Sequence, residues 1–146
     1  MSKVFMALFT GMLVTFIVDF FLFLGIQLHY IVPHEIDVYY NILFADHQNF
    51  AFFFLLSGIF GFIIIYISNK KLTMFTVISL TILAILPLFE PIGKSLGESL
   101  LMKKGITYKD NRFSFYGDVY YDGRKDITFY DYELQKMIIL KKKDLK

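Results

Sequence analysis

The chain has 146 residues, of which 56% are hydrophobic, and its formal net charge is only +2. A soluble domain of this length needs polar residues over its whole surface, whereas here they gather toward the C-terminal end. So small a net charge does not indicate nucleic acid as a partner. The absence of Cys excludes disulfides, thiolate metal sites, covalent haem attachment and cysteine nucleophiles.

Three apolar runs organise the first part of the chain, and they predict membrane-spanning helices at about 4–28, 50–68 and 72–89. Each run is long enough to cross a hydrocarbon core of about 30 Å, because a helix rises about 1.5 Å per residue. Only Asp19 and Gln27 interrupt the first run, and the other two carry no charge. The first run is longer than the apolar region of a signal peptide, so we expect a retained span.

The segment between the first two predicted spans, 29–49, is expected to lie at the outer membrane surface. In "PHEIDVYYNILF" the apolar and tyrosine side chains that share one helical face are Ile36, Tyr39, Tyr40 and Leu43. This pattern predicts a short interfacial helix with Pro33 in its first turn. The alternative is an irregular loop, and structureless loops of this length are uncommon.

Lysines close to the apolar runs set the expected orientation. Lys3 precedes the first span and Lys70 and Lys71 lie in the turn "SNKK", whereas 29–49 has no Lys or Arg. The positive-inside rule then places the N-terminus in the cytoplasm and the C-terminus outside. Every other Lys and Arg follows Glu90, which by itself favours an inside tail. We give the short loops more weight, because charges near the membrane edge count most.

The tail, 91–146, is expected to form an extramembrane unit beyond the transmembrane domain, 1–90. Its first stretch, "EPIGKSLGESLLMKKG", predicts an amphipathic helix ending at Gly105. Further on, Asp122 and Gly123 form a type I′ turn signal between two runs rich in Tyr, Phe, Val, Ile and Thr, which predicts a β-hairpin. The stretch "LQKMIIL" predicts either a third strand or a short helix, since two strands alone are marginally stable.

Small residues at four-residue spacing predict where the spans pack against one another. They are Ala7, Gly11 and Thr15 in the first span, and Ser57, Gly58 and Gly61 in the second. Small side chains let helix backbones approach closely in lipid. The predicted fold class is therefore an all-α membrane protein: a bundle of three transmembrane helices, a short interfacial helix and a small C-terminal β-hairpin module.

Two carboxylates are the candidate polar groups of the membrane region. Asp19 continues the spacing of the small residues, so we expect it to point inward and to be either protonated or hydrogen-bonded to Ser or Thr. Glu90 closes the outer end of the third predicted span. Intramembrane carboxylates mark proton or ion paths, or pair with a cation of a partner subunit.

All three histidines, His29, His34 and His47, fall in 29–49 together with three acidic residues. Histidine and carboxylate ligands suit zinc or copper, so one hypothesis is a metal site formed by these three histidines. Their spacing matches no strong metal motif, and the alternative is that they are interfacial residues that titrate.

Motifs for nucleotide binding and for serine hydrolysis are absent, so we expect no enzyme activity and no cofactor. The leading interpretation is an accessory or assembly subunit in a bacterial inner membrane. Its outer loop and C-terminal hairpin would dock a membrane-protein partner or a second copy. One alternative is an ion- or proton-handling oligomer built around Asp19. A further alternative is a membrane immunity-type protein.

Overall fold

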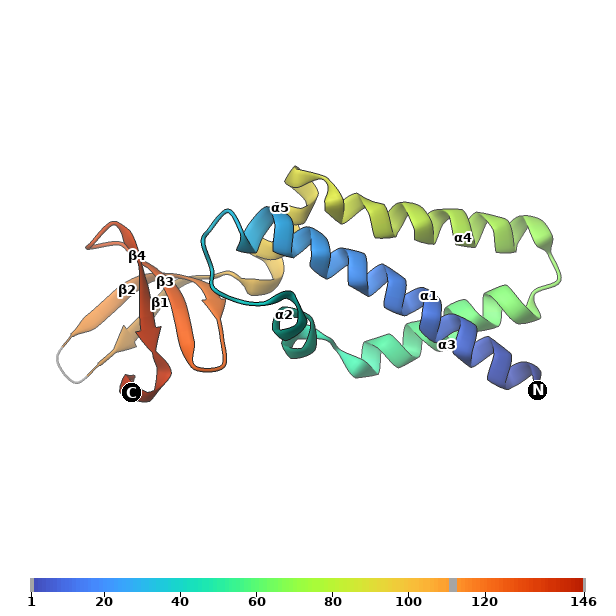
Figure 1. Ribbon diagram of the computed structural model, residues 1–146, viewed down its shortest axis with the longest axis horizontal. Coiled ribbons are helices and arrows are strands. Elements are labelled where there is room, and N and C mark those ends of the chain that lie inside the picture. Colours follow the sequence, from blue (N-terminus) through green and yellow to red (C-terminus); the bar gives the residue numbers. More distant parts are fainter. Residues whose placement is uncertain (1, 111–112, 146) are drawn as a thin grey trace.

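The structure, a computed structural model, describes residues 2–110 and 113–145 (Figure 1). The helices are α1 (Lys3–Ile26), continued by a π-helical turn (Gln27–Ile31), α2 (Tyr40–His47), α3 (Phe50–Tyr66), α4 (Lys70–Ile85), continued by a 3-10 turn (Leu86–Leu88), and α5 (Glu90–Leu101). The strands are β1 (Lys103–Lys109), β2 (Ser114–Asp122), β3 (Asp126–Asp131) and β4 (Lys136–Lys141), followed by a 3-10 turn (Lys142–Asp144).

Two helices are long and apolar enough to cross a membrane. They are α1 with its π-helical turn, Lys3–Ile31, and α4 with its 3-10 turn, Lys70–Leu88, with hydropathies of 2.2 and 1.9. α3 has only 17 residues and reaches spanning length only together with α2, from which it is bent by 83°. The number of candidate spans is therefore two, or three if the bent pair is one span.

The predicted fold class, an all-α bundle of three transmembrane helices with a hairpin, is wrong. The described chain has five α-helices and a four-stranded antiparallel sheet, and its second apolar run counts as a candidate span only together with α2. Asn49 caps the start of α3, where its side chain accepts a hydrogen bond from the Phe52 amide at 3.1 Å. This cap starts a new helix at Phe50, so α3 does not continue α2 in a straight line.

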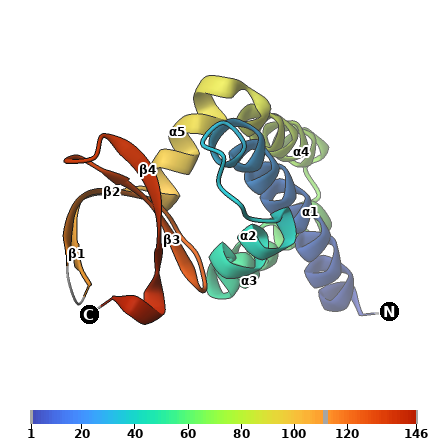
Figure 2. The same cartoon turned by 60° about the vertical axis from the view of Figure 1, so that its left-hand side comes forward.

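The sheet has the order β1-β2-β3-β4, and it curls so that its first and last strands approach each other (Figure 2). An isolated bridge between Asp110 and Leu145 joins the two ends of the curl. The core inside the curl is formed by Val119, Ile127, Phe129 and Leu140. The predicted hairpin corresponds to β2 and β3, and the stretch "LQKMIIL" forms β4, a third strand. The strand that precedes the hairpin, β1, was not predicted.

The helix expected to end at Gly105 ends instead at Leu101, and Lys103–Lys109 is β1. Gly105 has φ +64°, a conformation that interrupts a helix and that side chains other than glycine rarely adopt. The β-formers Ile106, Thr107 and Tyr108 follow it and pair with β2. Pairing with a partner strand therefore outweighs the weak helical pattern of this stretch.

A second core joins the helices to the sheet. Its buried side chains come from the end of α1, from the loop after it and from α2, α5 and β2, and include Tyr30, Ile31, Leu43, Leu101 and Tyr121. The Tyr30 hydroxyl donates to the Tyr120 carbonyl at 2.9 Å. In α5, a Cβ at Gly97 would overlap the Tyr30 ring, so glycine lets this ring pack against the helix. The sheet is therefore fixed to the end of α1.

Candidate functional site: a cleft between the loop and the sheet

One wall of the cleft is the loop that follows α1. The interfacial helix predicted from Pro33 begins only at Tyr40, and the residues before it form a turn and a segment without regular secondary structure. Glu35 adopts φ 54°, which ends any helical continuation there. The Gln27 amide donates to the Val38 carbonyl at 3.3 Å, and this bond holds the far end of the loop against α1.

The opposite wall is the outer face of the sheet near the β2–β3 turn. Tyr121 pairs with Thr128, and Thr128 pairs with Ile139, so these side chains form a row across three strands. A register shift between Val119 and Tyr121 directs Tyr121 away from the sheet core and into the core shared with the helices. The row is therefore positioned by a bulge in β2.

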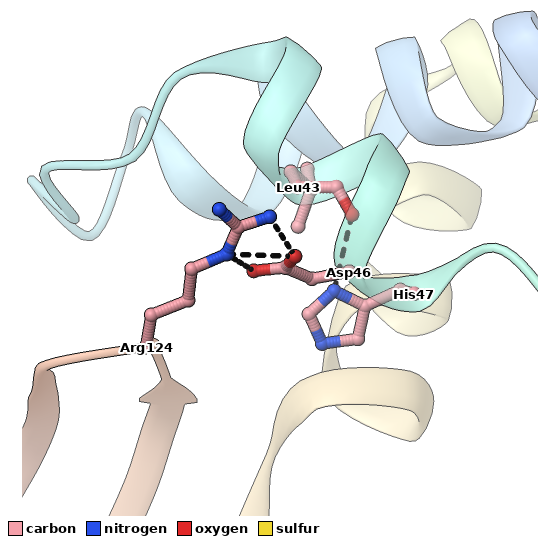
Figure 3. Close-up of polar contacts among 4 residues, drawn as sticks. All are labelled: Leu43, Asp46, His47 and Arg124. Atoms are coloured by element: carbon pink, nitrogen blue, oxygen red, sulfur yellow. Dashed lines mark hydrogen bonds and ion pairs between the residues drawn. The ribbon is translucent and has the colours of Figure 1, made fainter.

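An ion pair joins α2 to the β2–β3 turn, and its arginine, Arg124, lines the cleft (Figure 3). The Arg124 Nε donates to both carboxylate oxygens of Asp46 at 2.9 Å, and Nη2 donates to Oδ1 at 2.5 Å. Such bidentate pairs are charge-assisted and geometrically specific. Hydrogen bonds from Arg124 hold the pKa of the Asp46 carboxyl below its ordinary value of 3.8.

Between the two walls lies a cleft of about 940 Å³. Its lining is mainly apolar, with Val38, Tyr39 and Ile42 on the loop side and residues of β4 on the sheet side. Tyr121 also lines it, and this side chain is only 4% exposed. Its hydroxyl has no hydrogen-bond partner among the described residues. The size and composition are those of a site for a ligand or for a segment of another protein.

The three histidines lie apart, each bonded to a different backbone carbonyl. His29 Nε2 lies 2.8 Å from the Leu88 oxygen, and His47 Nδ1 lies 3.1 Å from the Leu43 oxygen (Figure 3). His34 Nδ1 lies 2.6 Å from the Tyr30 oxygen. In residues 2–110 and 113–145, no three His, Asp or Glu side chains are grouped to hold a metal ion. The structure therefore gives no support to the hypothesis that these histidines form a metal site.

Asp19 is half-buried on α1 and accepts a hydrogen bond from the Gln48 amide at 2.8 Å. Gln48 lies at the bend between α2 and α3, so the partner is an amide and not the Ser or Thr hydroxyl that we expected. Beside it, the Tyr40 hydroxyl donates to the Phe20 carbonyl at 2.9 Å. Glu90 lies far from this contact in the chain, exposed at the start of α5, where the helix dipole favours an acidic residue.

The small residues of α1 and α3 lie at a close helix contact. A Cβ at Gly11 would overlap the Ser57 carbonyl, and one at Gly61 would overlap the Ala7 carbonyl. Thr15 is buried one turn further along α1. A Cβ at Gly58, the remaining residue of the set, would meet open space.

No family model, no curated protein and no solved structure matches the chain.

The pairings of Gln48 with Asp19 and of Arg124 with Asp46 were not predicted from the sequence. The usable signals were a polar pair, Gln48 and Asn49, directly before an apolar run, and a lone Arg beside a turn signal. Neither signal indicates which carboxylate the side chain contacts.

Proposed function

We propose that this protein is a non-enzymatic membrane protein whose cleft docks a segment of a partner membrane protein, as in an accessory or assembly subunit. One observation carries the proposal. The two regions that the sequence marks as docking surfaces, the loop after α1 and the C-terminal sheet, line a single cleft. Tyr30, Leu43 and Tyr121 pack in one buried core between these regions, and the Asp46–Arg124 ion pair adds a contact between them, so the two walls are held side by side without a ligand.

The proposed location is a bacterial plasma membrane, with the N-terminus in the cytoplasm and the cleft on the outer side. The N-terminus and the turn between α3 and α4 lie at one end of the long axis, and the sheet lies at the other (Figure 1). Lys3, Lys70 and Lys71 are at the first end, which supports a cytoplasmic position for it.

Site-specific photo-crosslinking tests the docking proposal. A photo-reactive amino acid at Ile139, which lines the cleft and is 67% exposed, should give one discrete adduct with a membrane protein in living cells. The matched control is Phe113, which is 64% exposed and does not line the cleft. Equal adducts from both positions, or none from Ile139, would contradict the proposal.

Ion or proton handling by an oligomer around Asp19 is the competing function. The hydrogen bond from Gln48 favours a structural task for Asp19, because it ties α1 to the α2–α3 bend. Replacing Asp19→Asn removes the charge and leaves a side chain that can still pair with the amide. We expect unchanged membrane abundance and an unchanged Ile139 adduct. Loss of proton or ion flux in proteoliposomes, at normal abundance, would favour ion handling instead.

A further inference from the structure

β4 lies at the edge of the sheet with one side unpaired. In the order β1-β2-β3-β4, Lys136–Lys141 pairs with β3 alone, and the one bridge beyond it, between Asp110 and Leu145, lies past the end of the strand. Within the described part of the chain, no further backbone partner is found for β4. An edge strand of this kind presents N–H and C=O groups to any extended chain that approaches it.

The cleft reaches this edge. Successive residues of a strand point to opposite faces of the sheet, so a cavity on one face touches every second residue. Three consecutive residues of β4, Met137, Ile138 and Ile139, line the cleft, so it borders the backbone of this edge strand as well as the side chains of one face. A smaller hollow of about 310 Å³ is lined by Ile139, Leu140 and Lys141. The two hollows together follow β4 along most of its length.

The charges at the ends of β4 indicate what can pair with it. Lys136 and Lys141 flank an apolar centre of Met, Ile, Ile and Leu, and both lysines are exposed. Antiparallel pairing of two copies about this centre would place Lys136 of one opposite Lys141 of the other, and like charges directly opposite are destabilising. Each lysine lies opposite an aspartate of β3, Lys136 opposite Asp131 and Lys141 opposite Asp126, but among the described residues neither lysine forms an ion pair. Acidic residues of a bound segment at these two positions would therefore be favourable instead. Glu35 and Asp37 on the loop wall disfavour acidic residues in the middle of the bound segment.

We infer that the cleft binds an extended partner segment as an added strand on β4, with an apolar centre and an acidic residue at each end. This inference rests on the proposed docking function and specifies its chemistry. Main-chain hydrogen bonds to the edge would give affinity, and the flanking lysines would give selectivity.

Synthetic peptides provide the test. Fluorescently labelled EVTIVE and KVTIVK differ only in their end charges, and their binding to the full-length protein in detergent is followed by anisotropy. We expect EVTIVE to bind at least tenfold more tightly, and amide hydrogen exchange in β4 to slow when it binds. The double variant Lys136→Glu, Lys141→Glu should reverse the preference. The same charge change on the opposite edge, Lys104→Glu with Lys109→Glu in β1, should leave it unchanged.

The outcomes separate the two proposals. If neither peptide binds but the Ile139 adduct forms, docking stands and strand addition is overturned. If neither peptide binds and the adduct is also absent, both are overturned. Equal binding of the two peptides would overturn the charge argument. Slow exchange in β4 caused by self-association of the unmodified protein would identify a second copy as the occupant and overturn the inference.

Discussion

Gln48 and Arg124 each satisfy a carboxylate that is distant in the sequence. Gln48 reaches Asp19 on α1, and Arg124 reaches Asp46 on α2 across 78 positions of the chain. A carboxylate inside an apolar helix is costly unless it is hydrogen-bonded. The position of Asp19 is therefore explained by the bend between α2 and α3, which brings an amide to it.

The Asp46–Arg124 pair predicts a specific pH dependence. Because the pair lowers the folded-state pKa of Asp46, its stabilising contribution is present above the ordinary value of 3.8 and is lost as the pH falls through the lower folded value. Replacing Arg124→Gln should return the Asp46 pKa toward 3.8, because the hydrogen bond from Arg124 is the largest cause of the lowered pKa. Carboxyl carbon NMR of the protein in detergent micelles measures this titration.

Lys125→Gln is the control for that experiment, since it removes the same charge one position along the same turn. The Asp46 titration should be unchanged in this variant. Identical titrations in the unmodified protein and in Arg124→Gln would show that the ion pair does not form in solution.

At the scale of elements, α1 and α3 are held together by backbone contact that only small residues permit. The Ser57 hydroxyl donates to the Phe53 carbonyl at 2.7 Å within its own helix and therefore does not need a partner across the contact. In lipid, close van der Waals packing of this kind replaces the hydrophobic driving force between helices.

Two glycines of the same helix make a matched pair for testing this contact. Gly61→Ala should destabilise the protein, because its Cβ would overlap the Ala7 carbonyl and force α1 and α3 apart. Gly58→Ala should be neutral or stabilising by up to about 1 kcal/mol, because the site is open and Ala favours helix more than Gly. Thermal aggregation in detergent compares the two, and an equal loss in both variants would contradict the close contact.

Elements whose signal is local could be predicted, and those that depend on a distant partner could not. The helices α1 and α4 begin and end within a few residues of the predicted spans, because long apolar runs carry their own signal. β1 contains two lysines and a glycine before its β-formers, so only pairing with β2 makes it a strand. The cleft forms because Tyr121, Arg124 and Ile139 of the sheet region lie opposite the loop after α1. No sequence pattern in the loop or in the sheet predicts that the two lie together.

At the scale of the whole molecule, the loop, α5 and the sheet gather at one end of the helices (Figures 1 and 2). The basic residues near the two ends of the molecule favour opposite orientations in a membrane. Three lysines near the other end favour a cytoplasmic N-terminus, whereas eleven of the other twelve basic residues lie from Lys103 onward.

Reporter fusions test the proposed orientation. An enzyme active only outside the cytoplasm should be active when fused after the last residue and silent when fused at Asn69. A fusion within the loop after α1, at Asp37, should also be active, because this loop and the sheet share one end of the molecule. Activity at Asp37 with silence at the C-terminus would contradict the arrangement of the sheet beside the loop.

The continuity of α1 has a mechanical consequence. The helix and its π-helical turn run unbroken over 29 residues, about 43 Å at 1.5 Å per residue, which exceeds a hydrocarbon core of about 30 Å. In such a membrane the end of α1 that packs into the core shared with the sheet would extend beyond the hydrocarbon, and the sheet would move with the helix. A long helix adapts to a thinner membrane by tilting. Because the sheet is packed on the end of α1, a change in the tilt of α1 would also move the cleft relative to the membrane surface.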